Sequence, residues 1–312
     1  MSGRKIVTMQ PKTLDEMVAA ERRSFDAQFG SYGQIVYPGD AEAPILTPPV
    51  RAALHQWLYE MNSAPALEAV GLKPRTRALL SGPPGCGKTT LAHHMAARMG
   101  LPMLIVQSTE VITKWVGGTG ENIGKLFREA RRATGEIAIF FDEFDSMAHK
   151  RQSTGTSAGT EKNNIVIALL QEMDRFEGML FAATNMSIEI DPAIWRRFQL
   201  QIEIGFPGEE ERFAIVRRYL APYIVDDDTV AGIAAAFDGS SPALIKECGE
   251  SIRRSLVLGE RMGLSNALED IMVRFVAAAA PSEDMPVPRL WEAPSLEIAK
   301  LAKLPWPPEM PS

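Results

Sequence analysis

A run of glycines, a lysine and two threonines has the composition of a loop that binds phosphate groups. Its residues are Gly82, Pro83, Pro84, Gly85, Cys86, Gly87, Lys88, Thr89 and Thr90. Glycines at this spacing let backbone N–H groups turn inward around phosphate oxygens, and the following helix start adds its positive dipole end. Lys88 is placed to neutralise the β- and γ-phosphates, and the Thr89 hydroxyl to bind Mg²⁺. The run therefore predicts a site for ATP and Mg²⁺.

Cys86 within this loop has two interpretations. The start of a helix can lower the pKa of a thiol and make it reactive. The simpler interpretation, which we favour, is that Cys86 fills a position that needs a small residue.

An acidic pair, Asp142-Glu143, follows the apolar run Ile137–Phe141. Most Asp-Glu pairs are solvated surface residues, but carboxylates at the carboxyl end of a sheet strand lie where open α/β sheets bind ligands. Downstream of a phosphate-binding loop, Asp142 is expected to hold Mg²⁺ and Glu143 to polarise a water for attack on the γ-phosphate. A carboxylate that activates water favours a hydrolase over a kinase.

These residues belong to an alternation of short apolar runs and helical patterns. The apolar runs are Arg77–Ser81, Pro102–Gln107, Ile137–Phe141, Met179–Ala183 and Leu200–Phe206. The helical patterns between them are Lys88–Met99, Glu121–Ala133 and Lys162–Phe176. Buried strands separated by helices predict an α/β fold with a parallel sheet that is covered on both faces.

The strands stop after Pro207-Gly208, and only helical patterns follow. They are Glu209–Leu220, Asp227–Phe237, Pro242–Leu258 and Ser265–Ala279, and Ser241 is a good N-cap before Pro242. The predicted organisation is an N-terminal segment (1–45), a large α/β domain (46–207), a small helical domain (208–280) and a proline-rich tail (281–312). Two helices are predicted before the sheet, at Thr13–Phe29 and Pro49–Met61, joined by an extended connector. In the tail, Trp291 and Trp306 are expected to be exposed.

Composition narrows the class of protein. The chain has 312 residues, of which 46% are hydrophobic, and 33 basic against 39 acidic residues give a net charge of −6. This balance lacks the basic bias of a dedicated nucleic-acid binder. No apolar stretch is long enough to span a membrane, and the four histidines and two cysteines have no zinc-ligand spacing. The few cysteines and the lack of a secretory signal predict a cytoplasmic location.

Taken together, the chain resembles the AAA+ ATPases, within them the AAA subgroup of protein remodellers, over roughly residues 45 to 260. The resemblance rests on the phosphate-binding loop, on Phe140–Asp145, on Ala183-Thr184-Asn185, on Ile190–Ala193 and on the paired arginines before Phe198. It implies a sheet of order 5-1-4-3-2, a helical lid, and rings, usually hexamers, with ATP between subunits. It further implies that Asn185 positions the attacking water and that Arg196 and Arg197 reach a neighbour's γ-phosphate. That arginine pair is most similar to katanin and spastin; a solvent-exposed basic helix end is the other interpretation.

The resemblance also implies further binding residues. Gly239 and Ala243 would line the nucleotide base. Lys114, Trp115 and Val116 occupy the position of a pore loop that grips an extended polypeptide, although Trp115 packed in the core is an alternative. The polar segment His149–Asn164 lies where the family has a second pore loop, and its composition equally fits a disordered connector. The chain departs from the family with Asn163-Asn164 in place of an arginine, with Ser241-Pro242-Ala243-Leu244 in place of Ser-Gly-Ala-Asp, and with Lys246 where a sensor arginine is expected.

The expected function is an ATP-hydrolysing ring that unfolds or translocates a protein substrate. A partner protein could dock on the N-terminal segment or on the tail. Two alternatives stay open: a nucleotide-controlled scaffold that assembles without threading, and a nucleic-acid motor or loader, which the acidic balance disfavours.

Overall fold

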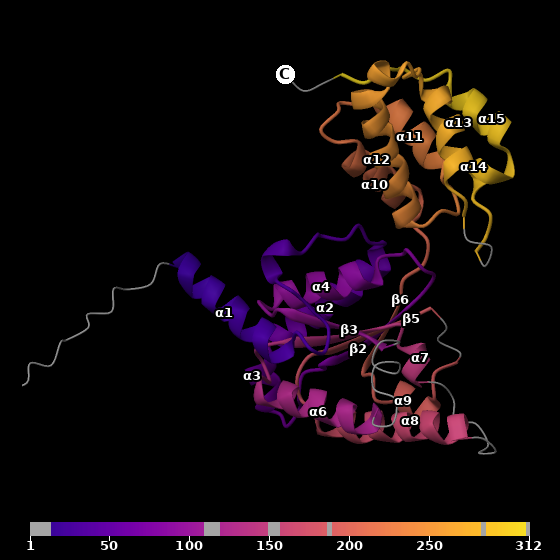
Figure 1. The fold of residues 1–312 in the computed structure, drawn as a ribbon. Coiled ribbons are helices and arrows are strands. Elements are labelled where there is room, and N and C mark those ends of the chain that lie inside the picture. Colours follow the sequence, from indigo (N-terminus) through magenta and orange to yellow (C-terminus); the bar gives the residue numbers. More distant parts are fainter. Residues whose placement is uncertain (1–13, 109–118, 149–156, 186–188, 282–284, 310–312) are drawn as a thin grey trace, which may run out of the picture.

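The computed structural model describes residues 14–108, 119–148, 157–185, 189–281 and 285–309 (Figure 1). Up to the third sheet strand, the elements are α1 (Leu14–Phe29), β1 (Gln34–Val36), η1 (Pro38–Asp40), α2 (Pro48–Asn62), α3 (Ala64–Glu68), β2 (Arg77–Ser81), α4 (Lys88–Arg98) and β3 (Met103–Gln107). The next are α6 (Thr119–Arg132), β4 (Ala138–Asp142), α7 (Asp145–Ala148), α8 (Ser157–Arg175), β5 (Leu180–Thr184), α9 (Pro192–Trp195) and β6 (Leu200–Glu203). Helix α8 begins five residues before the predicted Lys162, so part of the polar segment 149–164 is helical.

Six strands form one sheet in the order β1-β3-β4-β5-β2-β6. The pairs among the last five strands are all parallel. Numbered along the chain from β2, these five strands have the predicted order 5-1-4-3-2. Strand β1 adds an antiparallel edge to β3, with Gln34 opposite Ile105. The sequence predicts an extended connector at this position, because three residues are too few to show a strand pattern.

Side chains of the strands alternate between two cores, one on each face of the sheet. Leu79, Ile139 and Phe141 face the core formed with α1, α6 and α8. Ala78, Leu80 and Phe140 face the core formed with α2 and α4. Because successive side chains of a strand point to opposite faces, an apolar residue at every position buries both faces. The sheet is therefore the middle of three layers.

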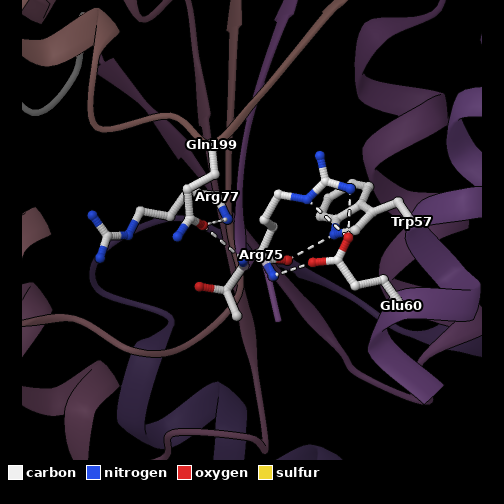
Figure 2. Close-up of polar contacts among 6 residues, drawn as sticks. Trp57, Glu60, Arg75, Arg77 and Gln199 are labelled. Carbon is white, nitrogen blue, oxygen red and sulfur yellow. Dashed lines mark hydrogen bonds and ion pairs between the residues drawn. The ribbon is translucent and has the colours of Figure 1, made fainter. Parts of the chain in front are cut away.

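Helix α2 is fixed to the start of β2 by polar contacts as well as by packing (Figure 2). The Trp57 indole N–H donates to the Arg75 carbonyl at 2.7 Å, and the Glu60 carboxylate accepts from the Arg75 Nε at 2.8 Å. On the other side, the Gln199 side-chain oxygen accepts from the Thr76 N–H at 2.9 Å. These bonds hold α2, β2 and the start of β6 together at the end of the sheet opposite the phosphate-binding loop.

A helical part follows β6, and Figure 1 shows it as a separate bundle joined through the chain after that strand. Its elements are α10 (Glu209–Leu220), α11 (Asp227–Ala236), α12 (Pro242–Leu258), η3 (Glu260–Met262), α13 (Leu268–Ala278), α14 (Arg289–Glu292) and α15 (Pro294–Leu301). The Ser241 hydroxyl accepts from the Leu244 N–H at 3.3 Å, as expected of the N-cap before Pro242.

The proline-rich tail packs against this helical part. Leu290 and Leu301 are buried in its core, and Trp291 and Trp306 pack against it. The Trp291 indole donates to the Ala279 carbonyl at 3.0 Å, and the Trp306 indole to the Asn266 carbonyl at 2.7 Å. The expectation of exposed tryptophans is therefore wrong, because an indole can bury its rings while its N–H finds a backbone acceptor.

Among the helices within the described ranges, none is long and apolar enough to cross a membrane.

Candidate nucleotide-binding site

The carboxyl ends of three neighbouring strands bring the predicted catalytic residues together. Strand β2 leads into the loop 82–87, β4 ends at Asp142, and Asn185 follows β5. In the sheet, Ser81 of β2 lies opposite Thr184 of β5, and Phe141 of β4 lies opposite Ala182. The motifs, separated by about a hundred residues, therefore meet at one edge of the sheet.

A cavity of about 420 Å³ opens at this edge. Of the predicted residues, those that line it are Pro84, Gly85, Cys86, Gly87, Lys88, Thr89, Thr90, Asp142, Glu143, Asn185 and Ala243. Gly82 and Pro83, at the start of the loop, are not among the lining residues, and their carbonyls accept bonds from Lys88. Gly239 lines an adjacent cavity of about 250 Å³, which shares Pro84, Gly85 and Ala243 with the first.

Lys88 is 8% exposed, and its ammonium has three hydrogen-bond acceptors. Nζ donates to the carbonyls of Gly82 and Pro83 at 2.8 and 2.9 Å and to the Asn185 side-chain oxygen at 2.6 Å. Burial lowers the pKa of Lys88, and the charges nearby, Asp142 among them, offset part of that effect. The ammonium therefore lies between the phosphate-binding loop and the end of β5.

Two oxygen donors suited to Mg²⁺ lie side by side. The Thr89 hydroxyl donates to an Asp142 carboxylate oxygen at 3.3 Å. Magnesium prefers oxygen ligands and is usually held in proteins by one or two side chains together with water and substrate phosphates. This pair fits that requirement, so Thr89 and Asp142 would hold the ion.

Glu143 has a backbone φ of 48°, which makes it the one non-glycine residue with a positive φ in the described chain. A positive φ is strained for a residue with a side chain and is found mostly at functional sites. The next residue, Phe144, fixes this backbone conformation. Phe144 is buried, and its N–H donates to the Ala183 carbonyl at 2.8 Å. The Glu143 side chain is exposed and lines the cavity.

Cys86 is 6% exposed and packs in the core shared with α2 and α4. Burial raises the pKa of its thiol to about 11, and the nearby Lys88 ammonium lowers it only in part. The thiol is therefore protonated at neutral pH, which supports the structural rather than the reactive interpretation.

The helical part touches the phosphate-binding loop directly. The Ala243 N–H, at the start of α12, donates to the Gly85 carbonyl at 3.2 Å. Gly85 has a φ of 74°, and a Cβ there would lie 2.9 Å from the Ser241 hydroxyl. A glycine at this position thus permits both the turn of the loop and the close approach of α12.

Sequence analysis missed the residues that close the other side of the cavity. They are Glu42, Ala43, Pro44, Ile45, Leu46, Ile215, Arg218 and Tyr219. Tyr219 donates to the Glu42 carboxylate at 2.7 Å, and Arg218 donates to the Ala43 carbonyl at 2.6 Å. Lys246 also lines the cavity, with its Nζ 5.3 Å from the centre of the Tyr219 ring. No local motif marks these residues, because two segments about 170 positions apart in the sequence supply them.

Neither Arg196 nor Arg197 lines this cavity. Both follow α9, and Arg196 is exposed whereas Arg197 is partly buried. The predicted pore-loop residues Lys114, Trp115 and Val116 lie outside the described residues.

Comparisons with known proteins find similarity to one family of ATPases. Residues 78–206 match the family described as "ATPase family associated with various cellular activities (AAA)". An uncharacterized AAA family ATPase, y4kL of Sinorhizobium fredii, is 35% identical over 207 residues, which cover 64% of this chain and 59% of the relative. ATP-dependent zinc metalloprotease FtsH 4 of Sphaerobacter thermophilus is 31% identical over 82% of this chain and 41% of its own length.

Among solved structures, the AAA domain of FIGL-1 in complex with ADP superposes with a TM-score of 0.64 at 20% identity. The superposition covers 95% of this chain and 100% of that domain, and at this identity it shows the shared fold. The chain spans about half the length of the curated relatives it matches. Residues 78–206, within which Lys88, Asp142 and Asn185 converge on the cavity, therefore match an ATPase domain of the AAA family.

Proposed function

We propose that this chain binds ATP with Mg²⁺ and hydrolyses it to remodel a protein substrate. The observation that carries the hydrolytic part is the convergence of Lys88, Thr89, Asp142, Glu143 and Asn185 on one cavity at the carboxyl ends of three strands. A lysine for phosphate charge, an oxygen pair for Mg²⁺ and a strained carboxylate are the parts that phosphoryl transfer to water needs.

Each residue has a distinct role in this proposal. Thr89 and Asp142 would hold Mg²⁺, which when bound would supply positive charge beside the phosphate oxygens. Glu143 accepts the proton of the attacking water as a general base. Lys88 offsets the negative charge of the β- and γ-phosphates, and Asn185, which is within hydrogen-bond reach of Lys88, orients the water.

The remodelling part rests on the family and on residues that have no role inside the subunit's own cavity. Arg196 and Arg197 lie away from that cavity, so they are available to act on the nucleotide of a neighbouring subunit in a ring, for which a hexamer is the family's usual size. Trp115 and Val116 follow β3 and precede α6 in the sequence, and the family resemblance implies that residues at this position grip an extended protein. The relative named as an ATP-dependent protease is a precedent for coupling this domain to work on proteins.

The direct test is the variant Glu143→Gln. The amide cannot take a proton, so kcat for ATP is expected to fall about 10²- to 10⁴-fold, while ATP binding and ATP-dependent assembly persist. Glu136→Gln is the matched control, because Glu136 is exposed just before β4, at the opposite end of that strand. Turnover of Glu143→Gln near the wild-type rate would remove Glu143 from this role.

The same variant separates the remodeller from its alternatives. Glu143→Gln assemblies, isolated with ATP, should retain a bound protein, which the parent protein releases on hydrolysis. A scaffold would assemble without retaining one in the ring. A nucleic-acid motor would show a salt-sensitive stimulation of its ATPase by DNA or RNA.

A further inference from the structure

Arg212, near the start of α10, is a buried cation with three oxygen partners. Its side chain is 10% exposed, and it donates from Nε to the Ala234 carbonyl at 3.0 Å and from Nη1 to the Pro207 carbonyl at 2.9 Å. The same Nη1 forms an ion pair with a carboxylate oxygen of Asp238 at 2.9 Å. A buried charge needs such partners, because removing it from water is costly. One nitrogen of Arg212 therefore links Pro207 to Asp238.

Pro207 belongs to the junction 204–208, the chain between β6 and α10 that joins the sheet to the helical part (Figure 1). The junction begins in backbone contact with the start of the phosphate-binding loop. The Ile204 N–H donates to the Ser81 carbonyl at 2.8 Å, and the Ile204 carbonyl leaves no room for a Cβ on Gly82. On this side, Arg212 is therefore tied to the phosphate-binding loop through the junction.

Asp238 opens the segment 238–243, which leads from the end of α11 into the first turn of α12. Within the described ranges, Arg212 is the one partner of the Asp238 carboxylate. At the other end of the segment, the Ala243 N–H donates to the Gly85 carbonyl at 3.2 Å. Both Ala243 and Gly85 line the ATP cavity, so the place of this segment sets the shape of the cavity beside the phosphates.

These contacts form a closed chain around the phosphate-binding loop. It runs from that loop to the junction, through Arg212 to the segment 238–243, and back to the loop at Gly85. The ion pair between Arg212 and Asp238 is the link made by two side chains, whereas the other links involve backbone atoms. A substitution at Asp238 therefore opens the chain of contacts and leaves each backbone group in place.

We propose that Arg212 and Asp238 are positioning residues that hold the segment 238–243 against the phosphate-binding loop and thereby set the affinity for ATP. This inference rests on the proposed ATPase activity. Neither residue is among those that line the ATP cavity, so both act through Ala243 and Gly85. The groups proposed for hydrolysis belong to the sheet and its loops, so losing the ion pair changes ATP binding more than turnover.

The first test is Asp238→Asn, which removes the charge of a side chain that is 58% exposed and keeps its size. The KM for ATP, and the Kd from calorimetric titration in the Glu143→Gln background, should rise about tenfold, the scale of a hydrogen bond to a charged group. At saturating ATP, kcat should stay within about twofold of the parent. Asp238→Glu, which retains the carboxylate, should recover most of the affinity. Parental ATP affinity in Asp238→Asn would overturn the proposal.

The matched control removes another ion pair that joins α10 to the chain at α11. Arg217 of α10 pairs with Asp227, the first residue of α11, and neither residue belongs to the junction or to the segment 238–243. Asp227→Asn should leave KM and kcat for ATP unchanged. An equal rise of KM in both variants would mean that any weakening of the helical part acts on ATP, which overturns the specific role of Arg212 and Asp238.

The second test follows the segment itself by amide hydrogen exchange. In the absence of nucleotide, the Ala243 amide should exchange faster in Asp238→Asn than in the parent, because its bond to Gly85 is held less firmly. The amide of Ile252, which is buried further along α12, should exchange at the parental rate. Weaker ATP binding with unchanged exchange at Ala243 would contradict the positioning role.

Failure of the inference can be told from failure of the proposed function. A parent protein that neither binds nor hydrolyses ATP would contradict the proposed function. An active parent whose Asp238→Asn variant binds ATP equally well would contradict the inference alone.

Discussion

Cys86 lies in a loop position that could make a thiol reactive, yet its surroundings make it unreactive. It stands three positions before Thr89, at a helix start that favours a thiolate, yet its side chain packs against the core between the sheet and α4. Burial raises the pKa of the thiol to about 11, and the nearby Lys88 ammonium lowers it only in part. A thiol of this kind serves as a small apolar residue that packs the phosphate-binding loop against the core.

A reactivity measurement checks this environment. At pH 8, a pKa of about 11 leaves about 0.1% of the Cys86 thiol ionised, so alkylation by iodoacetamide should be about two orders of magnitude slower than for a free cysteine. Mass spectrometry of the peptide that contains Cys86 gives the rate, and urea-unfolded protein is the control in which both cysteines react fast. Rapid labelling of Cys86 in the native protein would contradict a buried, protonated thiol.

Residues whose position depends on a local pattern could be placed from the sequence, although their roles stay predictions. The phosphate-binding loop, Asp142-Glu143 and Asn185 each follow an apolar strand directly, and the ends of parallel strands meet by geometry alone. The Asp174–Arg197 contact could not be predicted in this way. It joins the end of one helix to a turn 23 residues later, and only packing determines that the two meet.

At the scale of elements, the segment 42–46 connects the two parts of the molecule. Ile45 packs against the core of the helical part, whereas Leu46 packs against the core between the sheet and α2 and α4. Glu42 accepts the hydrogen bond of Tyr219 from α10. Because this segment and α10 form one wall of the nucleotide cavity, a change in either alters the shape of that wall.

Tyr219→Phe tests that connection. Burial and the Glu42 carboxylate raise the pKa of Tyr219 to about 12, so its hydroxyl remains protonated and donates. Removing a hydrogen bond to a charged group is expected to weaken ATP binding about fivefold, or about 1 kcal/mol, with little effect on kcat. Calorimetric titration with ATP in Glu143→Gln measures this loss without hydrolysis.

The matched control for that change is Tyr223→Phe in the same background, since Tyr223 lies just after α10 and is not among the residues that line the cavity. Equal affinities for ATP in the two variants would show that the bond to Glu42 does not shape the cavity.

At the scale of the whole molecule, composition predicts the structure of the tail less well than the family resemblance predicts the strand order. The tail is rich in proline, which indicates an irregular and exposed segment, yet its apolar residues complete the core of the helical part. Prolines end helices but do not prevent the residues between them from packing, and α15 begins with Pro294. The five-strand order, by contrast, could be predicted, because a family resemblance describes topology better than local composition does.

The proposed threading is also a property of the whole assembly. Trp115→Ala should retain ATP hydrolysis and lose processing of the protein captured by Glu143→Gln, because the change leaves the nucleotide site intact and removes the gripping side chain. The control is Tyr59→Ala, which removes an aromatic side chain that is 76% exposed on α2. Both rates are measured on the same preparation; undiminished processing by Trp115→Ala would argue against threading through this loop.

The three acceptors of Lys88 have a consequence for nucleotide affinity. An ammonium carries three hydrogens, and here each has an oxygen to bond: two carbonyls of the loop and the amide of Asn185. A phosphate oxygen can therefore bond to the Lys88 ammonium only by replacing one of these three acceptors. The side chain of Asn185 can rotate away more easily than the loop carbonyls can, because those belong to the backbone. If Lys88 binds the γ-phosphate as proposed, ATP would gain there only the difference between two sets of hydrogen bonds, and the exchange would release the Asn185 side chain.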